Sequence, residues 1–116
     1  MSIASDLIRG NTDMIILARL LKKESYGYEI NKHIQEISGG SYELKEATLY
    51  GCFRRLESMG YINSYWGDET TGARRRYYSI TPSGKQAFDS YKTEWQSAKD
   101  LIDRLTSQDM EDNYNA

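Results

Sequence analysis

The chain has 116 residues, which is enough for one domain with an extension rather than for two domains. Fifteen basic residues against seventeen acidic ones give a net charge of −2, which excludes a nucleic-acid-coating protein with a wholly basic surface. One cysteine, Cys52, excludes an internal disulfide framework and a cysteine-rich zinc site. With no 18-residue apolar stretch and no signal-like start, we expect a cytoplasmic protein with no membrane contact.

The first half of the chain predicts two helices. Residues 5–23 carry apolar side chains at helical spacing, and a second stripe over residues 26–38 follows Ser25, an expected N-cap. The second stripe contains Tyr26, Ile30, Ile34 and Ile37, and the glycine pair at 39–40 ends that helix.

A third helix is expected over residues 45–59, with Leu49, Cys52, Phe53, Leu56 and Met59 inward and Gly60 as its stop. The period then changes to that of strands over residues 61–66 and 75–80, which flank a polar loop and indicate a β-hairpin. Thr81 and Pro82 form a helix-start signal for a final helix to about residue 105.

This order predicts a mainly α fold with a small β-hairpin wing, a winged helix-turn-helix. We expect a DNA-binding domain over residues 1–80, a dimerisation helix over 81–105 and a flexible acidic tail over 106–116.

The charges point to the middle of the chain as the surface for a polyanion. Residues 45–85 carry a net charge of +3, against −1 for residues 1–44 and −4 for residues 86–116. The outward face of the third helix is expected to carry Lys45, Thr48, Arg54 and Arg55, with Tyr50 at its margin, where it can stack on a sugar or contact a phosphate. Lys45 and Thr48, near its start, suit base edges in the major groove, whereas the two arginines suit phosphates. An ordinary solvated helix face would have the same composition.

The wing adds three consecutive arginines, Arg74, Arg75 and Arg76, at the second strand of the hairpin. Side chains alternate along a strand, so at least one or two of these guanidinium groups point outward, where they can meet a DNA backbone. A charged strand edge that resists aggregation is the alternative interpretation.

Catalysis is not expected. The only histidine, His33, lies on a different helix from Cys52, and there is no phosphate-binding glycine loop and no cluster of metal ligands. We therefore predict neither enzyme activity nor a metal or other cofactor.

The final helix carries an apolar seam spaced 3, 4, 3, 4, 3, which is typical of a helix that packs on another helix. A helix of this length exceeds the width of the winged domain, so we predict a homodimer in which the first helix also takes part. Folding of the seam onto the first helix of the same chain is the alternative. The predicted interface contains Phe88, Tyr91, Trp95, Ile102 and Leu105, with Ala98 between them.

Three separate stretches resemble the PadR family of transcriptional regulators. Residues 47–62 (ATLYGCFRRLESMGYI) are similar to its third helix, residues 72–78 (GARRRYY) to its wing, and residues 80–84 (ITPSG) to the start of its final helix. Residues 26–30 (YGYEI) are similar to its second helix. The resemblance implies a transcriptional repressor, and the twofold symmetry of the predicted homodimer implies an inverted-repeat operator. The short final helix resembles a subgroup of which some members respond to drug-like compounds.

That resemblance implies an effector site, and the seam suggests where it lies. Trp95 beside the small Ala98 and Tyr91, repeated by symmetry, predicts a slot for a planar aromatic molecule, unless Trp95 simply fills the dimer core. Two other functions remain open: a winged-helix protein-interaction module without operator binding, and an RNA-binding winged helix.

Overall fold

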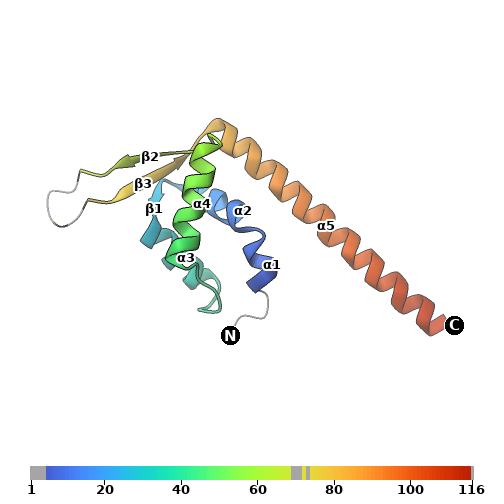
Figure 1. The fold of residues 1–116 in the computed structure, drawn as a ribbon. Coiled ribbons are helices and arrows are strands. Elements are labelled where there is room, and N and C mark those ends of the chain that lie inside the picture. Colours follow the sequence, from blue (N-terminus) through green and yellow to red (C-terminus); the bar gives the residue numbers. More distant parts are fainter. Residues whose placement is uncertain (1–4, 69–71, 73, 116) are drawn as a thin grey trace.

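The computed structural model describes the backbone of residues 5–68, 72 and 74–115, and the side chains of residues 6–68 and 74–107. Four helices precede a hairpin and one long helix follows it (Figure 1). The elements are α1 (Ser5–Arg9), α2 (Thr12–Lys22), β1 (Ser25–Tyr26), α3 (Gly27–Ile37), α4 (Glu46–Ser58), β2 (Ile62–Trp66), β3 (Arg76–Ile80) and α5 (Pro82–Asn115). The predicted fold class, mainly helical with a small wing, is confirmed.

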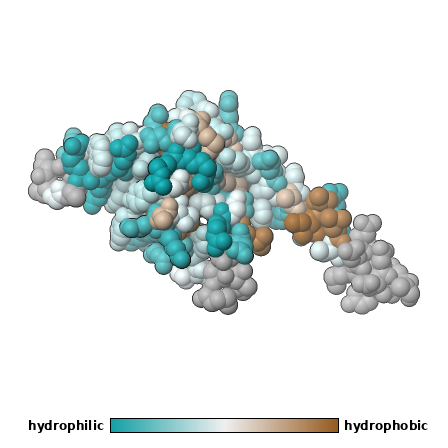
Figure 2. All heavy atoms as spheres, in the orientation of Figure 1, coloured by the Kyte–Doolittle hydropathy of each residue, from teal (hydrophilic) through white to brown (hydrophobic). Residues whose placement is uncertain are grey.

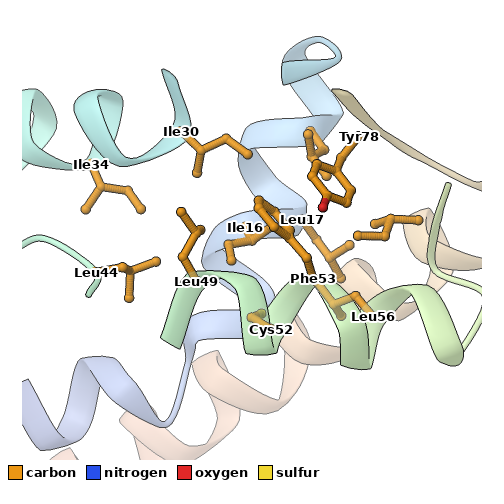
Figure 3. Close-up of a cluster of buried hydrophobic side chains, with 12 residues drawn as sticks. Ile16, Leu17, Ile30, Ile34, Leu44, Leu49, Cys52, Phe53, Leu56 and Tyr78 are labelled. Carbon is orange, nitrogen blue, oxygen red and sulfur yellow. The ribbon is translucent and has the colours of Figure 1, made fainter. Parts of the chain in front are cut away.

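The core lies where α2, α3 and α4 meet the base of the sheet (Figure 3). Phe53 of α4 stacks on Tyr78 of β3, with ring centroids 3.9 Å apart. Four of the five positions predicted to face inward from the third helix are buried, which confirms its rotation. The fully enclosed side chains are Phe53, Ile16, Leu17, Ile30, Leu56, Ile62, Cys52 and Ser25.

Two apolar residues that we expected inside are exposed instead. Ile37 is the last residue of α3 and is 75% exposed, while Met59 follows the end of α4 and is 41% exposed. Both helices end where a glycine takes a positive φ, 62° at Gly39 and 78° at Gly60, as their sequences predict. The chain turns away from the core at these glycines, so the last apolar residue of each stripe, Ile37 or Met59, is not buried.

The first predicted helix is divided in two, which corrects a single helix over residues 5–23. The break falls at Gly10 and Asn11, where the Asn11 backbone leaves helical geometry and its side-chain amide donates to the Leu7 carbonyl at 2.8 Å. Thr12, the first residue of α2, donates its hydroxyl to the Arg9 carbonyl at 2.8 Å. These side-chain hydrogen bonds compete with the backbone hydrogen bonds that a continuous helix would need.

The sheet has a third strand that the sequence did not reveal. β1 pairs with β3, giving the order β1-β3-β2 with all strands antiparallel. Ser25, expected to cap α3, is instead a buried strand residue whose hydroxyl donates to Glu29, and this bond lowers the pKa of that carboxyl group. The short strand holds the start of α3 against the base of the wing.

The long helix α5 begins as predicted and ends later. The backbone amide of Gly84 donates to the Thr81 hydroxyl at 3.0 Å, the expected N-terminal cap. The helix has 34 residues, roughly 51 Å at about 1.5 Å each, and continues to Asn115 rather than ending near residue 105. It projects away from the helical domain, opposite the wing, and the molecule is 71 Å along its longest axis (Figure 1).

The apolar seam of α5 is divided between two environments. Phe88 and Tyr91 pack against the core of their own chain. This agrees with the alternative prediction, in which the seam folds onto the same chain rather than onto a second copy. From Trp95 onward the described side chains are exposed, including Ile102 and Leu105. Only the second half of the predicted seam is therefore available to another molecule.

Candidate nucleic-acid interface

Helix α4 presents its polar face to solvent beside the wing. Lys45 precedes its first turn and, like Thr48 and Arg54, is exposed. Tyr50 is 41% exposed and its ring meets Phe53 edge to face, with centroids 5.5 Å apart. Arg55 is exposed as well, with 53% of its side chain accessible, so all five predicted α4 residues reach solvent.

Tyr50 lies close to the start of α3. A Cβ atom added at Gly27 would lie 2.7 Å from the Tyr50 hydroxyl oxygen, so glycine at this position lets the phenol pack against the α3 backbone. The phenol therefore lies where α4 meets the start of α3.

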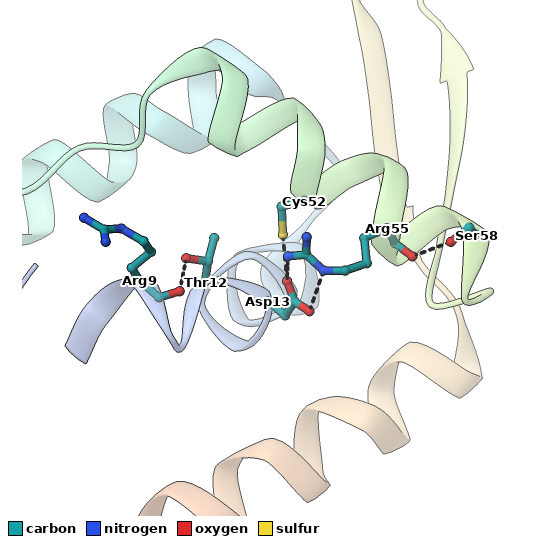
Figure 4. Close-up of polar contacts among 6 residues, drawn as sticks. All are labelled: Arg9, Thr12, Asp13, Cys52, Arg55 and Ser58. Carbon is teal, nitrogen blue, oxygen red and sulfur yellow. Dashed lines mark hydrogen bonds and ion pairs between the residues drawn. The ribbon is translucent and has the colours of Figure 1, made fainter. Parts of the chain in front are cut away.

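Arg55 takes a different role from its neighbour Arg54. Its guanidinium forms a bidentate ion pair with Asp13 of α2, with Nε 3.3 Å from Oδ2 and the second bond from Nη2 to Oδ1 (Figure 4). Hydrogen bonding to Asp13 raises the pKa of Arg55 above its usual value. The Arg55 guanidinium, which was predicted to contact a phosphate, therefore faces Asp13 of α2. The proposed interface does not include Arg55.

The Cys52 thiol joins the same cluster by donating to Asp13 Oδ1 at 3.0 Å. Burial, followed by this hydrogen bond, raises the pKa of the thiol well above its ordinary range. The predicted assignment of Cys52 to the core is confirmed, and the thiol is held in its unreactive protonated form.

The wing arginines are exposed and each lies over an aromatic ring. The Cζ atoms of Arg74 and Arg76 are 5.7 and 5.3 Å from the ring centroid of Trp66, and that of Arg75 is 4.7 Å from the ring of Tyr26. Trp66 is 53% exposed and pairs directly across the hairpin with Arg76. The sequence analysis missed both aromatic partners, although Trp66 stands at the end of a strand opposite the arginine run.

A groove of about 500 Å³ joins the wing to the helices. It brings Tyr50 and the three wing arginines together, as predicted, and adds residues that the sequence analysis did not select. The lining residues are Tyr26, Gly27, Tyr28, Tyr50, Trp66, Arg74, Arg75, Arg76 and Tyr78.

A second pocket, of about 360 Å³, gathers the three residues predicted to bind a ligand, Tyr91, Trp95 and Ala98. Its opposite wall is the junction of α1 and α2 in the same chain, including Met14 and Asp13. Burial raises the pKa of Tyr91, and the nearby Asp13 carboxylate raises it further.

Within the part of the chain that the structure describes, no helix is long and apolar enough to cross a membrane.

Comparison with known proteins gives consistent relatives. A transcriptional regulator of Clostridium thermocellum has a structure that superposes with a TM-score of 0.81 at 48% identity, covering 88% of this chain and 96% of that one. An uncharacterised protein of Lysinibacillus sphaericus is 45% identical over 87% of this chain and 93% of its own length. Bacillus subtilis PadR, solved in complex with operator DNA, matches with a TM-score of 0.62 at 28% identity, over 69% of this chain and 45% of that one.

The sequence profile of the PadR-like family of transcriptional regulators matches residues 16–90, which run from α2 to the first part of α5. The matched segment holds the core, α4, the wing and all the residues that line the groove. The chain therefore belongs to the PadR-like family of transcriptional regulators.

Proposed function

We propose that the chain is a sequence-specific DNA-binding regulator that represses transcription as a homodimer on an inverted-repeat operator. The observation that carries the proposal is the groove that unites Tyr50 of α4 with Arg74, Arg75 and Arg76 of the wing. A cationic hairpin beside an exposed helix matches a duplex, because the helix fits the major groove while the arginines follow the backbone.

The residues of α4 divide by position. Lys45 and Thr48 at its N-terminal end are assigned to base edges, where a helix in the major groove reaches deepest. Arg54, more than one turn further along, is assigned to a phosphate. Twofold symmetry would place the two α4 helices in successive major grooves, about 34 Å apart.

The second half of α5 supports the homodimer. Trp95, Leu101, Ile102 and Leu105 are large apolar side chains between 37% and 59% exposed. Figure 2 shows a hydrophobic patch on the projecting part of this helix. An apolar stripe on a helix that leaves its own domain is stabilised by burial against a second copy.

We assign the surface that receives α5 of the partner to a groove on the helical domain. A groove of about 410 Å³ between α2 and α3 contains Ile15, Ile34 and the exposed Ile37, with Arg19 and Lys22 among its lining residues. The Nε atom of Arg19 is buried and, among the described residues, has no hydrogen-bond partner. Residues 86–116 carry a net charge of −4, so the charge of this half of the chain complements the cations of the groove.

We also propose that a planar aromatic effector relieves repression by binding at Trp95. The pocket that Trp95 shares with Tyr91 and Ala98 adjoins the exposed half of α5, so a symmetric partner would extend it. A ligand that fits only one angle between the subunits binds that arrangement of the dimer more tightly than others. The favoured arrangement has a different spacing of the two α4 helices, so the ligand changes the affinity for the operator.

DNA binding is tested by comparing Arg54→Ala with Arg55→Ala. Loss of Arg54 should weaken binding to every duplex and reduce the slope of log affinity against log salt by about one. Arg55→Ala should leave that slope unchanged and lower the thermal stability instead, because the Asp13 carboxylate, which also accepts the Cys52 thiol, loses its guanidinium partner. Lys45→Ala should alter sequence preference. Equal affinity for promoter and random DNA, with no effect of Arg54, would contradict operator binding.

The effector site is tested in the Trp66→Phe variant, which leaves Trp95 as the single indole. Titration with planar aromatic dyes should quench Trp95 fluorescence, because stacking on the indole places the dye in contact with it. Trp95→Ala is the matched control and should bind the same dyes at least about tenfold more weakly. Unquenched fluorescence, or equal dye binding by Trp95→Ala, would exclude this pocket.

A further inference from the structure

The indole of Trp66 lies within cation–π distance of two guanidinium groups at once. Arg76 is its cross-strand partner in the hairpin, and Arg74 stands two residues before Arg76, so both side chains reach the same ring. Both Cζ atoms are less than 6 Å from its centroid, the range in which a cation is attracted to an aromatic face.

Each guanidinium is also anchored at its edge. Arg74 Nε donates to the Gly67 carbonyl at 3.0 Å, and Arg76 Nη2 donates to the Ser64 hydroxyl at 2.7 Å. A guanidinium has five N–H donors in one plane, and stacking engages its face rather than its edge. The two arginines are thus oriented by the ring, and within the described residues these two bonds leave further donors on each guanidinium for an acceptor.

We propose that Trp66 is a positioning residue that presets Arg74 and Arg76 for neighbouring phosphates of one DNA strand. The proposal rests on the DNA binding proposed above and concerns how the wing achieves it. Long arginine side chains lose rotamer freedom when they bind, and a ring that already holds two of them lowers this entropic penalty.

The surroundings favour a phosphate backbone over a base as the occupant. The guanidinium groups of Arg74 and Arg76 lie over Trp66 and that of Arg75 lies over Tyr26, so cations already engage the rings on which a base would stack. Tyr50 and Gly27 line the groove together with the arginines, so a strand that contacts α4 also passes the wing cations.

The test is the affinity of Trp66→Ala for operator and random duplexes across a salt series. We expect binding to both DNAs to weaken by about three- to tenfold and the salt slope to fall, because the arginines become mobile. Trp66→Phe should recover part of the loss, since a benzene ring holds cations less strongly than an indole.

Tyr65→Ala is the matched control. Tyr65 is the preceding strand residue, is 44% exposed and stacks on Tyr77 rather than on an arginine of the wing tip. The Tyr65→Ala substitution therefore removes a similar aromatic surface from the opposite face of the hairpin, and it should leave DNA affinity and salt slope unchanged.

A double-mutant cycle separates this role from others. If Trp66 acts through the arginines, adding Trp66→Ala to the Arg74→Ala/Arg76→Ala variant should change the affinity no further. An equal loss in both backgrounds, or no loss from Trp66→Ala alone, would overturn the positioning role. If Arg74→Ala/Arg76→Ala itself leaves DNA binding intact, the wing contact of the proposed function fails instead.

Discussion

Replacing Ile102 by Asp is expected to convert the protein to a monomer and to weaken operator binding by at least about a hundredfold. Ile102 is 59% exposed in the single chain, so the carboxylate is tolerated there. Burial of two unpaired carboxylates in a symmetric interface would cost several kcal/mol, which is enough to dissociate it. In a dimer, binding of one half-site raises the effective concentration of the second α4 helix at the other half-site, and a monomer lacks this gain in affinity.

Sedimentation at micromolar concentration measures the first effect, and binding to a full inverted repeat against a single half-site measures the second. Thr93→Asp is the control, because Thr93 is exposed on α5 but lies opposite the apolar stripe, and it should remain dimeric. A monomeric unmodified protein would contradict the dimer, and a dimeric Ile102→Asp variant would contradict its assignment to the apolar stripe of α5.

The parts of the site that follow from helical and strand periods were predictable. The burial of Leu49, Phe53 and Leu56 fixed which side of α4 faces solvent, and this placed Lys45, Thr48 and Arg54 outside. The run of Arg74 to Arg76 could be assigned to the wing because the loop before it contains turn residues.

Features that depend on contacts between distant segments were not predictable. Arg54 and Arg55 are adjacent and chemically identical, and only the position of Asp13, 42 residues away from Arg55, gives them different roles. β1 has two residues, too few for a periodic signal, and exists because Ser25 and Tyr26 pair with β3.

The polar composition of residues 106–116 predicts a flexible tail, whereas the structure continues α5 through residue 115. Residues 106–115 contain neither glycine nor proline, the residues that most often end a helix, and their polar side chains are compatible with helical geometry. The helix therefore continues through them to Asn115.

The largest effect on stability is expected from Gly84→Ala at the start of α5. A Cβ atom at Gly84 would lie 2.1 Å from the Tyr61 carbonyl oxygen and 2.8 Å from Cγ1 of Ile80. That carbonyl accepts the Thr81 amide at 3.0 Å, so it cannot withdraw without breaking the bond that joins the hairpin to α5. We expect a loss of about 3 kcal/mol or more in the free energy of unfolding.

Gly51→Ala provides the matched substitution in another helix. A Cβ there meets only the end of the Arg54 side chain at 3.8 Å, and glycine inside a helix is less favourable than alanine by about 0.8–1 kcal/mol. Thermal unfolding should therefore shift in opposite directions, upward for Gly51→Ala and downward by more than about 10 °C for Gly84→Ala. A melting temperature of Gly84→Ala within a few degrees of the unmodified protein would show that α5 can leave the hairpin without loss, and the packing described between them would be wrong.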